Sequence, residues 1–219
     1  KKLEETCEKI FHPITGTPMD DLFTRYMYFI RAKRDNNKSS TTESLRRFYE
    51  RDKYSVLKQD DTFENLKDLA QFWEDITDQN RERFSEDVLK KLFILNYAPN
   101  SMWNYFISVY YLANRTEDGK LGDEDFKMFL DRTIAFIWGY AIMHPGVNAL
   151  RTPIFAEMLN IVNLNEVTFS DFKFDKEQTR SAILIYDFKN GRPITKSMLA
   201  LRMMLNKEQL YPKLSQQFD

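Results

Sequence analysis

The stretch WNYFISVYYLANRTEDGKLGDEDFKMFLDRTIAFIW, residues 103–138, joins two apolar and aromatic segments through a polar loop. The loop NRTEDGKLGDED, residues 114–125, can be written as a twelve-residue calcium loop with Gly119 at position 6 and Asp125 at position 12. It can also be the turn of a helix hairpin, in which the acids at 123–125 favour the N-terminus of the second helix. The choice decides whether the chain carries a metal site or is a plain helical protein.

The ligand chemistry of this loop favours the hairpin. A calcium loop normally has an aspartate at position 1 and a bidentate glutamate at position 12. Here Asn114 stands at position 1, Thr116 is a weak ligand at position 3, and Asp125 is shorter than glutamate. EF-hands usually occur in pairs, and the sequence contains no second loop of this kind. We therefore expect no metal or other cofactor in this chain, and a calcium-binding module through 114–125 is the less favoured alternative.

The composition predicts a helical protein with a sizeable core. The chain has 219 residues, 42% of them hydrophobic, and only 6 glycines and 7 prolines interrupt it. This length and apolar content predict a folded domain, and few breakers favour helices over strands. We expect an all-α, irregular bundle of mostly antiparallel helices that forms a single domain over residues 1–219. An internal boundary near residues 164–175, where a polar and aromatic stretch separates two helical patterns, is the alternative.

Apolar periodicity and capping residues set the expected helix limits. We expect helices over residues 17–34, 41–57, 60–77, 85–95, 99–114, 123–143, 152–162, 175–190 and 194–211. Thr17, Ser85 and Thr152 are the expected N-caps, two of them followed by proline at the first helical position. In the third of these helices Phe63 is expected on the same inner face as Trp73.

Charge is segregated along the chain although the net charge is only −1. Residues 25–58 contain ten lysines and arginines against four acids, whereas residues 59–87 contain ten acids against three basic residues. The basic residues that lie nearest one another, and that we expect to contact a nucleic-acid backbone, are Arg46, Arg47, Arg51 and Lys53. The alternatives are that adjacent helices pair oppositely charged faces, or that both faces are simply solvated.

Nothing in the sequence predicts catalysis or a membrane span. The two histidines, His12 and His144, each precede a proline, and neither has a sequence partner that would position it for acid–base work. The sequence has no zinc-ligand cluster and no glycine-rich phosphate loop. Its single cysteine, Cys7, fits a reducing compartment, so we expect a cytoplasmic location. No apolar run reaches the roughly 18 residues that a membrane helix needs.

The order of the helical segments resembles a known family. The segments are LFTRYMYFIRAK, SLRRFYERDKYSVL, ENLKDLAQFWEDI, LDRTIAFIWGYAIMHPGVNALRTPIFAEML and TRSAILIYDFKNG. Together they are similar to the helical middle of GmrSD-type proteins, which are associated with restriction of modified foreign DNA. That family has an N-terminal nucleotide-dependent domain with a D-G-Q-Q-R signature and a C-terminal HNH-like nuclease domain. Neither signature occurs in this sequence, and no catalytic residue of the family has a counterpart here.

The resemblance implies a non-catalytic piece of a larger bacterial restriction or phage-defence protein. The chain begins KKLEETC without an initiator methionine and stops before the family's nuclease motif, so we expect a fragment. The full-length protein would be a modification-dependent endonuclease, with the flanking domains and DNA as partners of this segment. The alternative is a stand-alone helical scaffold for protein interactions, with an apolar patch around Met198, Leu201 and Leu205.

Overall fold

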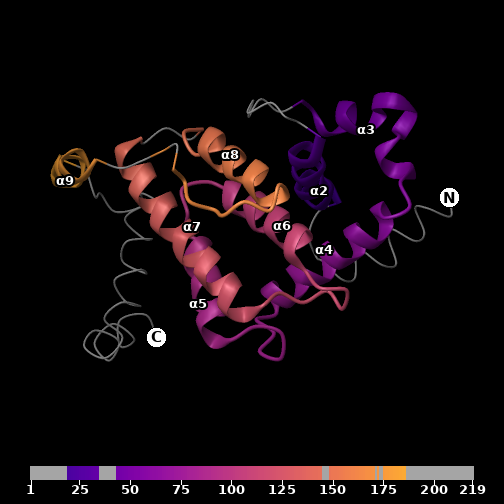
Figure 1. The fold of residues 1–219 in the computed structure, drawn as a ribbon, viewed down its shortest axis with the longest axis horizontal. Coiled ribbons are helices and arrows are strands. Elements are labelled where there is room, and N and C mark those ends of the chain that lie inside the picture. The colour runs from indigo at the N-terminus through magenta and orange to yellow at the C-terminus, as the bar shows by residue number, and fades with distance from the viewer. Residues whose placement is uncertain (1–18, 35–42, 145–147, 171, 173–174, 186–219) are drawn as a thin grey trace.

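The protein is helical throughout its described part. The computed structural model describes residues 19–34, 43–144, 148–170, 172 and 175–185. The elements are α2 (Met19–Arg34), α3 (Leu45–Tyr54), the 3-10 helix η1 (Val56–Lys58), α4 (Thr62–Thr77), α5 (Glu86–Leu95), α6 (Met102–Asn114), α7 (Asp123–Met143), α8 (Arg151–Val162) and α9 (Lys176–Ile185). Within these ranges there is no strand, and the helices pack as a bundle, which confirms the all-α prediction (Figure 1).

Helix α2 occupies the centre of one half of the bundle. It contacts α3, α4, α6 and α8, and its residues from Arg25 to Ala32 are all buried. Leu22 and Tyr26 have no exposed surface, and burying a large apolar side chain contributes about 1.5–3 kcal/mol relative to leaving it in water. The run YMYFI supplies apolar side chains at consecutive positions, and a helix with apolar residues on every side is typical of a buried element.

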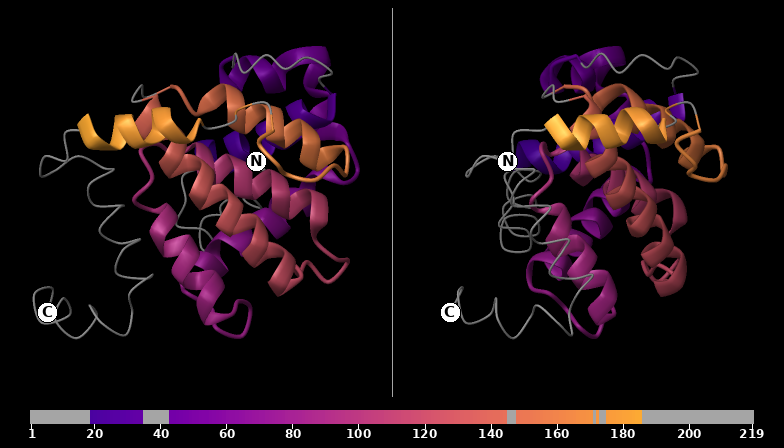
Figure 2. Two further views of the ribbon diagram at one scale, coloured as in Figure 1. Left: turned by 60° about the vertical axis from the view of Figure 1, so that its left-hand side comes forward. Right: turned by 90° about the vertical axis from the view of Figure 1, so that its left-hand side faces the viewer.

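The second half of the bundle is built on the helix hairpin of α6 and α7. Helix α6 packs on α2 and α8, α5 packs on α7, and α9 packs on the C-terminal part of α7 (Figures 1 and 2). Aromatic stacking joins these elements: the ring centroids of Tyr110 and Phe129 are 3.9 Å apart, and those of Phe72 and Tyr111 are 4.1 Å apart. The high aromatic content of the sequence therefore goes mainly into the core.

Several expected helix limits are confirmed, and two details are wrong. Ser85 caps α5, since its hydroxyl accepts a hydrogen bond from the Val88 amide at 3.3 Å, and α7 has the expected limits. Helix α8 begins one residue before Thr152, so this threonine lies inside the first turn. Phe63 is 41% exposed, although Leu66, Ala70 and Trp73, with which it shares a helical spacing, are buried.

Helix α3 is not the straight helix that the sequence predicts. Its backbone turns extended at Arg51 and then left-handed at Asp52, Lys53 and Tyr54, whose φ values are 51°, 56° and 63°. Left-handed backbone is unfavourable for residues with a side chain, although aspartate tolerates it better than most. The bend brings Val56 into the core, where its carbonyl accepts a hydrogen bond from the buried Thr62 hydroxyl at 2.6 Å.

The segment that follows α8 packs against the bundle in an extended form. Val167 and Phe169 are buried, and the rings of Phe169 and Phe136 stack at 3.9 Å. The predicted cap Thr17, the helix expected over 194–211 and the patch expected at Met198, Leu201 and Leu205 lie outside the described residues. None of the helices in the described ranges is long and apolar enough to cross a membrane.

Candidate nucleic-acid interface

The four basic residues predicted to contact nucleic acid all belong to α3, at one edge of the molecule. Figure 1 shows α3 above α2 and at the opposite end of the molecule from α9. Phe48 and Tyr49 anchor the helix, since both are buried and the Tyr49 hydroxyl donates to the Phe23 carbonyl at 2.8 Å. Burial raises the pKa of the Tyr49 hydroxyl far above its usual range, so it stays a neutral donor. The apolar side of α3 is thereby fixed, and its other side faces solvent.

All four cationic side chains are exposed, but two of them already have carboxylate partners. The Arg46 Nε donates to Glu50 at 2.7 Å, and Arg51 forms an ion pair with Glu43. Arg47 and Lys53 form no ion pair with any described residue. The predicted set is therefore brought together on one short element, with two of its four charges not committed to a neighbour.

The charge count over residues 25–58 overstates the exposed positive charge. Arg25 and Arg31 lie on α2 and are buried, with 9% and 6% of their surface exposed. Both pack on aromatic faces: Arg25 lies 4.1 Å from the ring centre of Trp73, and Arg31 lies 4.9 Å from that of Phe155. Their burial could be foreseen from the apolar neighbours on every side of α2, whereas a count of charges along the chain ignores where each side chain points.

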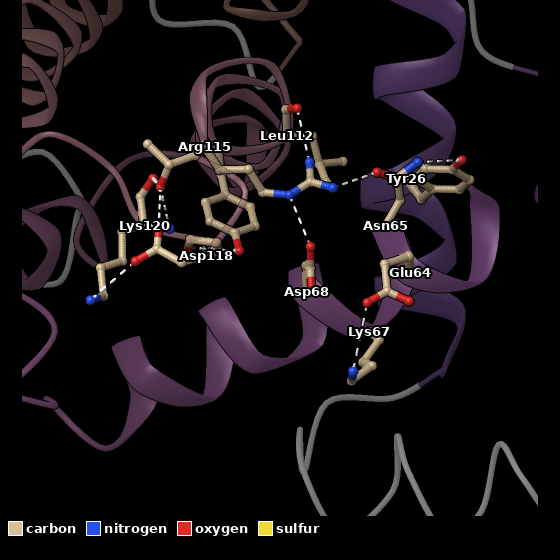
Figure 3. A network of polar contacts seen from close by, with 12 residues as sticks. Tyr26, Glu64, Asn65, Lys67, Asp68, Leu112, Arg115, Asp118 and Lys120 are labelled. Carbon is tan, nitrogen blue, oxygen red and sulfur yellow. Dashed lines mark hydrogen bonds and ion pairs between the residues drawn. The ribbon is translucent and has the colours of Figure 1, made fainter.

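Asp68 and Asp75, in the acidic segment 59–87, pair with Arg115 at the end of α6 and with Arg83 of the same segment. Figure 3 shows Arg115 between two helices: its Nε donates to Asp68 at 3.0 Å and its Nη2 to Asn65 at 2.7 Å. Asn65 continues the network by donating to the Tyr26 hydroxyl at 3.4 Å. Arg83 in turn lies 3.5 Å from Asp75. The ion pair of Asp68 with Arg115 joins α4 to the end of α6. Neither Asp68 nor Asp75 pairs with a basic residue of α3, so these two pairs are not contacts between the acidic and the basic segment.

The loop 114–125, for which calcium binding was the less favoured alternative, is a compact turn in which several of the candidate ligands have protein partners. Gly119 has φ +72°, and its carbonyl accepts hydrogen bonds from Arg83 and, at 3.2 Å, from the Tyr111 hydroxyl. The Asn114 amide donates to the Tyr110 carbonyl at 2.9 Å, and Asp118 pairs with Lys120. Across the described ranges no group of three or more Asp, Glu, His or Cys side chains is placed to hold a metal ion. The glycine therefore serves the hairpin turn.

His144 terminates α7. Its backbone amide donates to the Tyr140 carbonyl at 2.8 Å, its ring centre lies 4.4 Å from that of Tyr140, and the residue is exposed. The geometry is that of a helix end, in which the ring packs on the preceding turn. His12 lies outside the described residues.

Comparisons of the chain with protein-family models, with curated proteins and with solved structures found no match. The functional assignment therefore depends on the chemistry of the exposed and buried side chains described above.

Proposed function

We propose that the chain is a non-catalytic helical domain of a restriction or phage-defence protein, which connects a nucleotide-dependent domain to a nuclease domain and contacts DNA through α3. The observation that carries the DNA contact is the exposure of Arg47 and Lys53, which have no carboxylate partner among the described residues, beside Arg46 and Arg51 in the element that Phe48 and Tyr49 anchor. The order of segments similar to the GmrSD-type family supports the connecting role. The flanking domains and DNA are the partners that this role requires.

The chemistry of α3 suits contact with phosphates. Lysine and arginine side chains bind the DNA backbone by charge and displace condensed counterions, independently of sequence. Arg46 can exchange its exposed partner Glu50 for phosphate, because exposed ion pairs contribute little free energy, and Arg51, itself 56% exposed, lies beside it with a half-buried partner in Glu43. The left-handed bend at 52–54 turns the chain away from the helix axis directly after Arg51, so Lys53 does not follow the helical face. Such strained backbone often accompanies binding sites.

The test is the affinity of the chain for a labelled DNA duplex, measured by fluorescence anisotropy over a series of salt concentrations. Arg47→Glu with Lys53→Glu should weaken binding at low salt by at least about tenfold and lower the salt slope by about 2, the value for two lost phosphate contacts. Both side chains are exposed, so the fold should be unaffected.

The matched control is Arg81→Glu with Arg180→Glu, which changes the net charge by the same amount at exposed positions outside α3. It should keep most of the affinity. Unchanged binding by the α3 variant would contradict the proposal. An equal loss in both variants would also contradict it, because attraction would then depend on total charge and not on α3.

A further inference from the structure

A pocket of about 620 Å³ lies between Arg25 of α2, the end of α4, α5 and the start of α6, and no residue of α3 lines it. Its lining includes three cationic residues, Arg25, Arg81 and Lys90, and one carboxylate, Glu86, which pairs with Lys90. Its size lies within the range of pockets that hold small molecules, about 300–1,000 Å³. The sequence indicated no ligand site in this region.

Arg25 is the unusual group in this pocket. The residue is nine-tenths buried, and its Nε and Nη1 atoms are buried without a hydrogen-bond partner among the described residues. Burial lowers the pKa of its guanidinium to about 10, and the charge of Asp21 acts in the opposite direction. Even so the group is cationic at neutral pH. A buried cation with unsatisfied donors is costly, and a negative charge bound in the adjoining pocket lowers that cost by electrostatic attraction.

The aromatic wall of the pocket is held rigidly. The Trp73 ring lies 4.1 Å beneath the guanidinium of Arg25, and its indole N–H donates to the Ser108 hydroxyl at 2.9 Å. Trp103 packs edge-on against Trp73 with ring centres 5.8 Å apart, and Phe93 is 51% exposed in the same lining. The pocket thus combines a fixed cation with aromatic and aliphatic surface, the two features that a small organic anion requires.

We propose that this pocket binds a small organic anion, with its carboxylate or phosphate group against Arg25 and an apolar, ring-bearing body against Trp103 and Leu89. Arg81 adds positive charge in the same lining. The guanidinium suits either head group, because its positive charge attracts a carboxylate and a phosphate alike. This site is separate from the DNA-contacting surface of α3 and does not depend on it.

The test is titration calorimetry of the 219-residue chain with phenyl phosphate and with benzoate, alongside inorganic phosphate and phenol. One or both aromatic anions should bind, and each that binds should exceed inorganic phosphate and phenol by at least about tenfold, since each of those supplies only half of the contacts. The tighter of the two aromatic anions identifies the head group. Tryptophan fluorescence should change on binding because Trp73 and Trp103 line the pocket.

Two variants and a control make the test specific. Arg25→Met should lower the affinity at least about tenfold, and Arg81→Gln, an exposed position that leaves the fold intact, should lower it by a smaller factor. Arg47→Gln, on α3, should bind as the unmodified chain does. Absence of binding by both aromatic anions at millimolar concentration, or undiminished binding by Arg25→Met, would overturn the proposal. If inorganic phosphate bound as tightly as phenyl phosphate, the proposed contact of the ligand's ring with Trp103 and Leu89 would be overturned.

Discussion

The Nε atom of Arg115 lies 3.0 Å from Oδ2 of Asp68, and this ion pair ties the residue that ends α6 to the middle of α4. Both side chains are largely withdrawn from solvent, and Arg115 also donates to Asn65 and, at 3.0 Å, to the Leu112 carbonyl. The four groups form a single cluster between helices that are far apart in sequence. Removing one partner of such a pair costs more than removing one partner of an exposed pair, because the other charge is left largely buried and unpaired.

We predict that Arg115→Gln lowers the free energy of unfolding by about 1–3 kcal/mol, through the loss of the ion pair and its hydrogen bonds. Urea denaturation followed by circular dichroism measures the change. Arg46→Gln is the matched control, since it removes an ion pair whose arginine is 85% exposed, and it should leave the denaturation midpoint unchanged. Equal midpoints for the two variants would show that the Arg115 cluster does not stabilise the fold.

We predict that Gly119→Ala destabilises the protein by about 1 kcal/mol or more, whereas Gly122→Ala does not. Gly119 has φ +72°, and an added Cβ would meet the Tyr111 hydroxyl at 3.4 Å. Gly122 has φ −64°, and its Cβ would meet only the exposed Asp125 side chain, at 3.2 Å, which can move aside. Thermal denaturation of both variants measures the difference. A Gly119 variant as stable as the Gly122 variant would contradict this account of the turn.

Stability should fall in the alkaline range because of the buried Tyr111 and the half-buried Tyr110. Burial raises the pKa of Tyr110 and of Tyr111 to about 12, above the usual value of about 10. As the pH rises past 10 the unfolded chain loses these protons first, so it binds fewer protons than the folded chain and unfolding becomes easier. The contribution is fully present below pH 10 and is lost as the pH rises through 12.

The measurement is the urea midpoint at a series of pH values from 8 upward, with phenolate absorbance recorded in parallel. Tyr110→Phe should flatten the decline between pH 10 and 12, because one of the groups responsible is removed. A decline of the same steepness in this variant would show that Tyr110 is not among those groups.

We predict that Arg25→Met raises the free energy of unfolding by about 1 kcal/mol in the absence of ligand. The stacking on Trp73 contributes about 2 kcal/mol for a desolvated cation, whereas the effective cost of burying a cation is several kcal/mol. Methionine has a similar length and no donors to satisfy. Urea denaturation checks the sign. A loss of stability would mean that the guanidinium of Arg25 stabilises the fold. Its burial would then not be a free-energy cost that ligand binding offsets.

The helix framework was largely predictable, because it follows from local signals. Ser85 and the acids that open α7 specify their helix starts, and the turn at Gly119 agrees with a helix hairpin. The bend of α3 was not predictable, since Asp52 is held left-handed by contacts made elsewhere: the burial of Val56 and its hydrogen bond from Thr62. Local propensity contains no information about such tertiary contacts.

The two candidate sites also differ in whether local sequence signals could predict them. The exposure of Arg47 follows from its place beside the buried Phe48 and Tyr49 on a short amphipathic helix, so the sequence could propose it. Lys53 lies in the left-handed bend, which the sequence did not predict. The pocket at Arg25 could not be proposed, because it needs α2, α4, α5 and α6 to be positioned together.

The central position of α2 has a consequence for the way the chain folds. Its contacts with α8 join residues near position 30 to residues beyond position 150, as the edge-on contact of Tyr28 with Phe155 illustrates. During synthesis the apolar sides of α2 must therefore stay uncovered until the ribosome has delivered α8. Folding that depends on such distant contacts is slow, and α2 is prone to aggregation while its apolar side chains are uncovered. The nascent chain is thus most in need of a chaperone between the emergence of α2 and that of α8.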